Sequence, residues 1–403
     1  MLIRLLLLLI LASSLSGCLG PTALNQALPA YDETVSQLQG QALLLNIARA
    51  RHHMAPHFTS TMSIAATFKF ESSVGLTGNA PESSDVYATG SIELGTSVTE
   101  NPTIELVPMR GEDFSNLMLS PLTDDKFRLI VSESVSIDML IRLMGKAFLF
   151  QDETGALIRT VRNQPNKPEE YAEYRRIAAH LASLRARNQL FVRRLTFLEG
   201  ETFTFPNGLS ADDVLRAHEA GYDYVALNET NKYRLSRSVL GSTIVTNIDP
   251  LSDSDAERAA LDKVIALTPN NYVDINIRSE GPGGDYALRG AIQLRSFNEV
   301  LSFIARGIEE DPEFDVSPDS RSKKIQGIVP STGDWQKNPE RIITVLESKK
   351  PPSSDIMQVR YKGLYYSVKQ DPWDLDAFNT LYLMLQMSTQ TTPRRSFPVT
   401  ISK

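Results

Sequence analysis

Apolar and polar residues alternate from Thr61 to Thr99. Even positions carry mainly apolar residues and odd positions mainly small polar ones, on both sides of a polar turn at 78–85. A period of two places the apolar residues on one face of a strand. The pattern therefore predicts a long amphipathic β-hairpin over residues 61–99.

The same alternation predicts the register of the hairpin. Paired residue numbers must sum to an even number if the apolar positions of both strands are to share a face. A sum of 164 would set Glu71 opposite Glu93, which like-charge repulsion disfavours. We therefore predict a sum of 162, which pairs Lys69 with Glu93 and Phe70 with Ile92.

Helical spacing precedes the hairpin. Asp32 can cap a helix that runs to about Arg51, with apolar residues recurring on one face. After residue 110, stretches with the helical spacing of apolar residues and stretches with strand-like alternation both occur. They predict helices near 112–119, 124–149, 168–187, 210–221 and 296–307 and from Asp371 onward, and strands near 190–198, 201–205, 222–227, 231–237, 272–278 and 291–295, with a final strand–turn–strand around Lys362-Gly363.

These elements predict an α+β fold, in which an N-terminal helix and the long amphipathic β-hairpin are followed by small mixed α/β units. The predicted division is a signal peptide at 1–17, a lipidated tether at 18–30, the helix and hairpin at 31–110, a mixed α/β unit at 111–246, an α/β unit at 247–308, a loop or linker at 309–340 and a C-terminal ββα unit at 341–403.

The first residues have the layout of a secretory signal. Arg4 supplies a positive charge, an apolar run follows, and small residues lead to Cys18, the only cysteine of the chain. Leu15-Ser16-Gly17-Cys18 resembles the lipobox of bacterial lipoproteins. The resemblance implies a diacylglycerol on the Cys18 sulfur, cleavage before Cys18 and acylation of its new amine. The alternative is an ordinary secretory signal in which Cys18 is incidental.

The resemblance also implies where in the cell the protein is located. Leu19 follows the cysteine instead of the aspartate that retains enterobacterial lipoproteins in the inner membrane. We therefore expect a lipid-anchored protein of the outer membrane that faces the periplasm. Four further stretches, at 43–51, 101–114, 292–297 and 359–371, together resemble an uncharacterised proteobacterial outer-membrane lipoprotein family. That resemblance implies no catalytic residue.

Composition narrows the function. The net charge of −7 and the absence of a basic face argue against a nucleic-acid partner. One cysteine excludes a disulfide within the chain. We find no phosphate-binding loop and no nucleophile elbow, and the carboxylate pairs Asp124-Asp125 and Asp212-Asp213 stand at predicted helix starts, where the helix dipole explains them.

The histidines and arginines also have structural explanations. His52, His53 and His57 are close in sequence, but Pro56 interrupts the helix that would align them as metal ligands. His180 and His218 are predicted to lie on helix surfaces. A solvated helix face explains the basic cluster, with lipid phosphates as the alternative contact; it comprises Arg175, Arg176, Arg185, Arg187, Arg193 and Arg194.

The hairpin has two possible environments. A barrel-spanning strand needs about 9–11 residues, and both runs are long enough. A ring of subunits, each donating one hairpin, could close a barrel, an architecture that resembles the oligomeric curli-secretion lipoprotein and outer-membrane efflux channels. The alternative is a soluble hairpin whose apolar face covers a core.

The sequence therefore predicts lipidation at Cys18 and no catalytic, metal or cofactor residues. We expect a non-enzymatic structural or adaptor component of an envelope assembly, with hairpin 61–99 as the route to a ring. Its expected partners are outer-membrane lipid, through Cys18, and envelope proteins or further copies of the chain. The alternative is a periplasmic hydrolase of cell-wall or surface polysaccharide, which would need two facing carboxylates about 5–10 Å apart.

Overall fold

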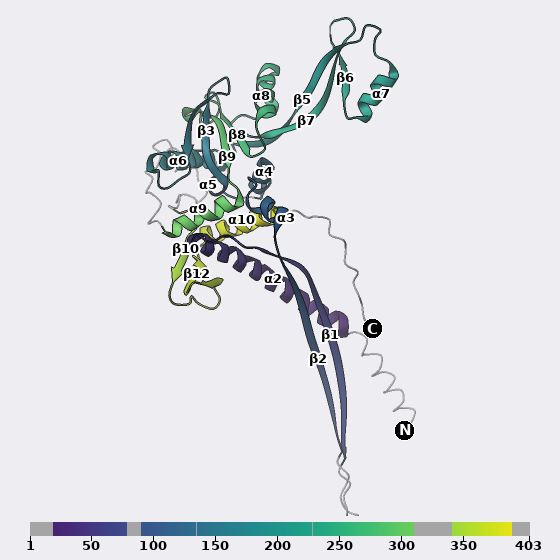
Figure 1. The fold of residues 1–403 in the computed structure, drawn as a ribbon, viewed down its shortest axis with the longest axis vertical. Coiled ribbons are helices and arrows are strands. Elements are labelled where there is room, and N and C mark those ends of the chain that lie inside the picture. Colours follow the sequence, from purple (N-terminus) through teal and green to yellow (C-terminus); the bar gives the residue numbers. More distant parts are fainter. Residues whose placement is uncertain (1–18, 79–89, 134, 228, 310–340, 389–403) are drawn as a thin grey trace, which may run out of the picture. The chain divides into compact units, whose positions relative to one another are not determined.

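The computed structural model describes residues 19–78, 90–133, 135–227, 229–309 and 341–388 (Figure 1). It is a mixture of helices and strands, with both parallel and antiparallel strand pairs, which confirms the predicted α+β class. The chain forms two compact units. The first comprises residues up to 42 together with 57–110, and the second comprises 43–56 together with the residues from 111 onward.

Helix α2 (Leu19–Arg51) contributes to both units. It ends at Arg51, as predicted, but it begins well before Asp32. The predicted tether is therefore helical from Leu19, because alanine, leucine, asparagine and glutamine at 23–28 are compatible with a helix. Asp32 could act as an N-cap only if its backbone were non-helical, and here the helix continues through it. In the second unit the C-terminal part of α2 buries Leu43, Leu44 and Ile47.

The first unit contains the hairpin, with antiparallel strands β1 (Thr59–Gly78) and β2 (Gly90–Pro108). From Ser63 onward, paired residue numbers sum to 168: Lys69 pairs with Thr99 and Phe70 with Val98. The predicted sum of 162 is wrong, although the predicted even parity is right. β2 continues nine residues beyond Thr99 to Pro108, and the backbone pairs gained there outweigh one Lys–Glu pair, which contributes only about 0.2–1 kcal/mol.

The second unit is built on a seven-stranded sheet of order β4-β3-β9-β8-β7-β5, with β6 also paired to β7. Only the β7–β8 pair is parallel among these described strands. The sheet joins strands from both sides of residue 247, so the predicted division there is not a boundary between sheets. The strands are β3 (Gly145–Gln151), β4 (Leu157–Arg162), β5 (Phe191–Thr204), β6 (Asp223–Ala226), β7 (Lys232–Thr246), β8 (Tyr272–Ile277) and β9 (Leu288–Leu294).

Several stretches of this unit differ from the predicted elements. The strands predicted at 190–198 and 201–205 form the single strand β5, and β7 continues nine residues beyond the predicted end at 237. The predicted helix 124–149 is two helices and strand β3, because a short buried apolar run fits a strand as well as a helix. Helix α8, which the predicted elements do not include, opens with a capping box between Ser254 and Glu257. The helices are α3 (Gly111–Met118), α4 (Asp124–Ser132), α5 (Ile137–Met144), α6 (Pro168–Ala186), α7 (Ala211–Glu219), α8 (Asp255–Leu267) and α9 (Phe297–Glu309), with a 3₁₀ turn at Pro250–Ser252.

The two faces of the sheet differ in character. Alternation along β8 places Val273, Ile275 and Ile277 on one face, where all three are buried. Asp274 and Asn276 therefore lie on the other face, on which Ile244 of the neighbouring β7 packs against α8. Strand β8 thus combines an apolar core face with a polar face beside α8.

The C-terminal part forms a small sheet of order β10-β12-β11 and a helix, α10 (Pro372–Ser388). A two-residue turn, Lys362-Gly363, joins β11 (Gln358–Tyr361) to β12 (Leu364–Val368), and both turn residues have positive φ. Asp371 caps α10, since its Oδ1 accepts the Asp374 backbone N–H at 3.0 Å. The predicted turn and the helix expected from Asp371 onward are confirmed, and β10 (Val345–Ser348) completes the sheet.

Candidate functional site

A groove of about 570 Å³ lies beside α8 on the polar face of the large sheet. Strands β8 and β9 contribute to its lining, as do one side of α8 and the turn between β3 and β4. Its lining is acidic: five carboxylates accompany two arginines. These residues are Asp152, Glu153, Glu257, Asp274, Glu280, Arg278 and Arg289.

Asp274 is the most deeply buried carboxylate of the groove. Its side chain accepts hydrogen bonds from Ser242 Oγ at 2.5 Å and from Thr268 Oγ1 at 3.1 Å. Loss of hydration raises the pKa of Asp274 to about 6, and the nearby charge of Asp124 adds to this effect. Asp274 is thus held in place by two hydroxyls and takes up a proton more readily than an exposed aspartate.

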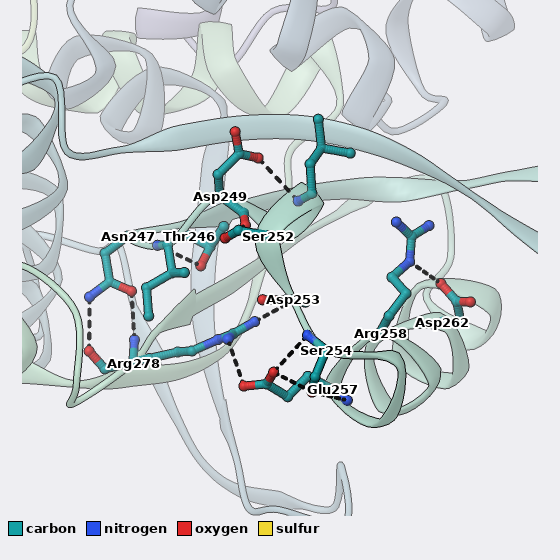
Figure 2. A network of polar contacts seen from close by, with 12 residues as sticks. Thr246, Asn247, Asp249, Ser252, Asp253, Ser254, Glu257, Arg258, Asp262 and Arg278 are labelled. Atoms are coloured by element: carbon teal, nitrogen blue, oxygen red, sulfur yellow. Dashed lines mark hydrogen bonds and ion pairs between the residues drawn. The ribbon is translucent and has the colours of Figure 1, made fainter.

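Arg278 organises the network at the start of α8 (Figure 2). Its guanidinium contacts Asp253 at 2.7 Å and Glu257 at 3.4 Å. Only 1% of the Asp253 side chain is exposed, so the arginine compensates a carboxylate that has lost its water. Glu257 also completes the capping box with Ser254. The ion pairs therefore tie the end of β8 to the first turn of α8.

Asn247 fixes the chain that follows β8 (Figure 2). Its Nδ2 donates to the carbonyl oxygens of Arg278 and Pro282, at 2.8 and 2.9 Å, and its Oδ1 accepts the Arg278 backbone N–H at 2.8 Å. The segment then turns through Gly283, whose φ of +72° favours glycine.

The partners of these carboxylates determine what the groove can do. Asp253 and Glu257 are engaged by Arg278 and by the cap of α8, and Asp274 by two hydroxyls. A glycosidase needs one carboxyl group free to donate a proton and a second free to attack or to activate water. The geometry gives Asp253, Glu257 and Asp274 structural partners, and Asp152, Glu153 and Glu280 complete the acidic surroundings of the groove.

Asp124 and Asp212 were both expected at helix starts, but one is buried and the other is exposed. Both occupy the first turn of a helix, as predicted. Asp212 is exposed and pairs with Arg216. Asp124, however, is buried and accepts both the backbone N–H and the hydroxyl of Thr243 in β7, at 2.7 and 2.8 Å. It therefore fastens α4 to the sheet in addition to favouring the helix start.

The predicted solvated arginine face is wrong for Arg175, which is 2% exposed. It lies near Asp138, which pairs with the fully buried Arg142 at 3.6 Å. The amphipathic period of α6 did not reveal this charge cluster, because its partners come from α5. Arg176 is exposed, as predicted. Four further arginines have partners in the fold: Arg187 bonds the Ser183 carbonyl, Arg185 the Val131 carbonyl, Arg193 pairs with Asp249 and Arg194 with Asp125.

The histidines are dispersed over the fold. His52 Nε2 lies 2.8 Å from the Tyr366 hydroxyl, while His53 and His57 are exposed. The predicted surface position of His180 is wrong: it is 7% exposed and packs edge-on against Tyr286. His218 is exposed, as predicted, beside Asp223. Within the described parts of the chain, no group of three histidines, cysteines or acidic residues is arranged to hold a metal.

The predicted lipidation site, Cys18, lies outside the described residues, and so does the lipobox. None of the described helices is long and apolar enough to cross a membrane.

No family model matches the chain. Neither a curated protein nor a solved structure is significantly similar to it.

Proposed function

We propose that this chain is an outer-membrane lipoprotein, anchored through Cys18 and facing the periplasm, that acts as a non-enzymatic structural or adaptor component of an envelope assembly. The hairpin carries the proposal. Among the described strands, β1 and β2 pair only with each other, so each leaves one edge of backbone donors and acceptors for another chain. A hairpin on a neighbouring copy is the simplest partner, and repetition of that contact gives a ring.

The observed register supports a membrane-facing role for the distal half of the hairpin. Phe70 pairs with Val98, Val74 with Leu94 and Leu76 with Ile92, so apolar positions coincide on the two strands. The intervening odd positions carry mainly small or polar residues. Residues 70–78 and 90–98 provide nine positions in each strand, close to the roughly 9–11 that a tilted barrel strand needs.

The anchor is tested by replacing Cys18 with Ser. We expect the variant to lose incorporation of radiolabelled palmitate and to leave the outer-membrane fraction, because serine has no sulfur to accept diacylglycerol. Leu19→Ala is the matched control and should label normally. If Cys18→Ser still incorporates palmitate and sediments with outer membrane, the proposed anchor is wrong.

The hairpin role is tested with single cysteines in the lipidated protein, in which the thioether at Cys18 does not react with maleimides. Cysteines at positions 74, 76, 92 and 94 should react poorly with polar maleimides, and fluorophores placed there should be quenched by lipid-borne probes. Positions 73, 75, 93 and 95 should label from water. Shielded even positions without lipid quenching, together with a monomer in detergent, would show that the hairpin covers its own protein core.

A further inference from the structure

The groove beside α8 combines an apolar wall with an excess of negative charge. Its volume of about 570 Å³ is roughly 40 times the space that one water needs, so it has room for a polypeptide segment. Ala260, Leu261 and Val264 of α8 form the apolar wall. Val264 is 41% exposed, so an occupant that covered it would remove apolar surface from water.

The negative charge of the groove is only partly compensated. Its lining holds five carboxylates and two arginines, which gives a formal charge of −3 when all seven groups are ionised. Among the described residues, Asp152, Glu153 and Glu280 make no ion pair with a basic side chain. Arg278 is already held by the two ion pairs at the start of α8. The lining therefore favours a cationic occupant.

Residues 389–403, outside the described part of the chain, have the complementary composition. They include three basic residues and no acidic one, and three apolar residues alternate with others, as on one face of an extended segment. The basic residues are Arg394, Arg395 and Lys403, and the alternating apolar ones are Phe397, Val399 and Ile401. Two other stretches outside the described part, 79–89 and 310–340, carry more acidic than basic residues. Charge therefore selects 389–403 among these segments.

The position of Ser388, where α10 ends, allows this segment to reach the groove. Lys126 of α4 donates to the Ser388 hydroxyl at 3.2 Å. Asp124, at the start of α4, bonds the β7 residue that precedes Ile244, and Ile244 lines the groove. All of these groups belong to the second unit. The fifteen residues 389–403 span up to about 50 Å when extended, so they are long enough to pass around the sheet.

We propose that residues 389–403 occupy the groove of their own chain, with Arg394 and Arg395 beside its carboxylates and the alternating apolar residues against α8. The contact covers Val264 and offsets the excess negative charge of the lining. Because the segment is tethered, its effective concentration at the groove is on the order of millimolar, so individually weak contacts suffice. A partner protein that uses the groove must therefore displace this segment.

The test measures whether the segment lies beside α8. The full chain carries Cys18→Ser, so that a bimane fluorophore labels only Ser396→Cys, and the protein is purified in detergent. Tryptophan quenches bimane only at close range. Val264→Trp and Ala287→Trp place tryptophan at two exposed positions of the groove lining, and Leu215→Trp on α7 is the matched control. We expect the groove tryptophans to reduce the fluorescence at least about twofold relative to the control, as for a tethered segment bound in most molecules.

Charge variants then identify what holds the segment. Glu153→Gln combined with Glu280→Gln should lower the ratio of bound to free segment about fivefold, the effect expected for the loss of two exposed ion pairs. Glu201→Gln combined with Glu219→Gln removes two exposed carboxylates outside the groove and should leave the ratio unchanged. Added salt should release the segment in the same direction as the groove variant, because it screens exposed charges.

The segment itself provides a second comparison. Arg394→Gln combined with Arg395→Gln should abolish the excess quenching by the groove tryptophans, because both cationic contacts are lost. Arg394→Lys combined with Arg395→Lys keeps the charges and should retain most of it. Circular dichroism confirms that each variant is folded, and two tryptophan positions keep the result independent of either substitution.

Three results would overturn the proposal. The first is equal quenching by the groove tryptophans and by the tryptophan on α7. The second is excess quenching that is unchanged by the loss of the groove carboxylates and by the loss of both arginines. The third is quenching that disappears on about hundredfold dilution, which would place the segment in the groove of another copy, since an intramolecular contact does not depend on concentration.

Discussion

At the scale of single residues, Asp274 makes stability depend on pH in a definite direction. A carboxyl group whose pKa is about 6 when folded binds a proton more readily in the folded than in the unfolded chain. Its favourable contribution is present below about pH 4 and is lost as the pH rises through 6. We expect this loss to amount to about 2–3 kcal/mol of unfolding free energy.

The measurement is urea unfolding of the wild type and of Asp274→Asn between pH 4 and 7. Asparagine keeps an acceptor for Ser242 and cannot ionise, so the wild type should lose stability relative to the variant as the pH rises. Burial also raises the pKa of Asp374 to about 6, but this group is common to both proteins and cancels in their difference. Asp212→Asn, at an exposed carboxylate, is the control. Equal pH slopes for the wild type and Asp274→Asn would contradict the prediction.

At the scale of secondary-structure elements, the register of the hairpin can be tested by cross-linking. The structure pairs Lys69 with Thr99 and Phe70 with Val98. Of two adjacent antiparallel pairs, one has no hydrogen bond between its residues and brings the Cα atoms to about 4.5 Å, within reach of a disulfide. We therefore expect a double-cysteine variant at one of these pairs, in a Cys18→Ser background, to form an intramolecular disulfide.

The matched control places cysteines at Lys69 and Glu93, the pair that a sum of 162 would create. In the observed register Lys69 lies opposite Thr99 and Glu93 opposite Gly75, six positions apart along the strands. The control should remain reduced under the same mild oxidation, read by gel mobility and mass spectrometry. Efficient cross-linking of the control, and of neither observed pair, would return the hairpin to the register expected from charge pairing.

At the scale of the whole molecule, the hairpin should be removable without unfolding the second unit. The Met109 backbone N–H donates to the Phe58 carbonyl at 2.9 Å, so the two ends of the hairpin are already adjacent. Replacing residues 60–107 with Asn-Gly closes this gap with a two-residue turn. We expect the thermal midpoint of the second unit to change by less than about 4 °C, since no contact within that unit is lost.

The same deletion separates folding from assembly. If the proposed role of the hairpin is right, the shortened protein should retain its lipid and outer-membrane fractionation but sediment as a monomer in detergent. Deletion of the same residues combined with Cys18→Ser should also lose the membrane fraction. A shortened protein that still forms the oligomer of the wild type would place the association surface elsewhere in the chain.

The sequence by itself determined features that depend on neighbouring residues. The helices expected from about 210, 296 and 371 and the Lys362-Gly363 turn are all present, because their capping and turn contacts join groups a few residues apart. The even parity of the hairpin follows from the same short-range alternation. The capping box at Ser254 is an equally local signal of a helix start, although the predicted elements do not include this helix.

The tertiary structure alone decided features that join distant residues. One sheet unites strands across residue 247, the Asp124 side chain meets Thr243, and Arg295 meets the carbonyl of Arg142. The alternation in β8 predicts that Asp274 lies on the face opposite the apolar residues, and Arg295 directly follows an apolar strand. Neighbouring residues in the sequence do not indicate which groups these side chains contact. Burial and hydrogen bonding then set the charge state and accessibility of these groups, because the groups that remove their water come from other elements of the fold.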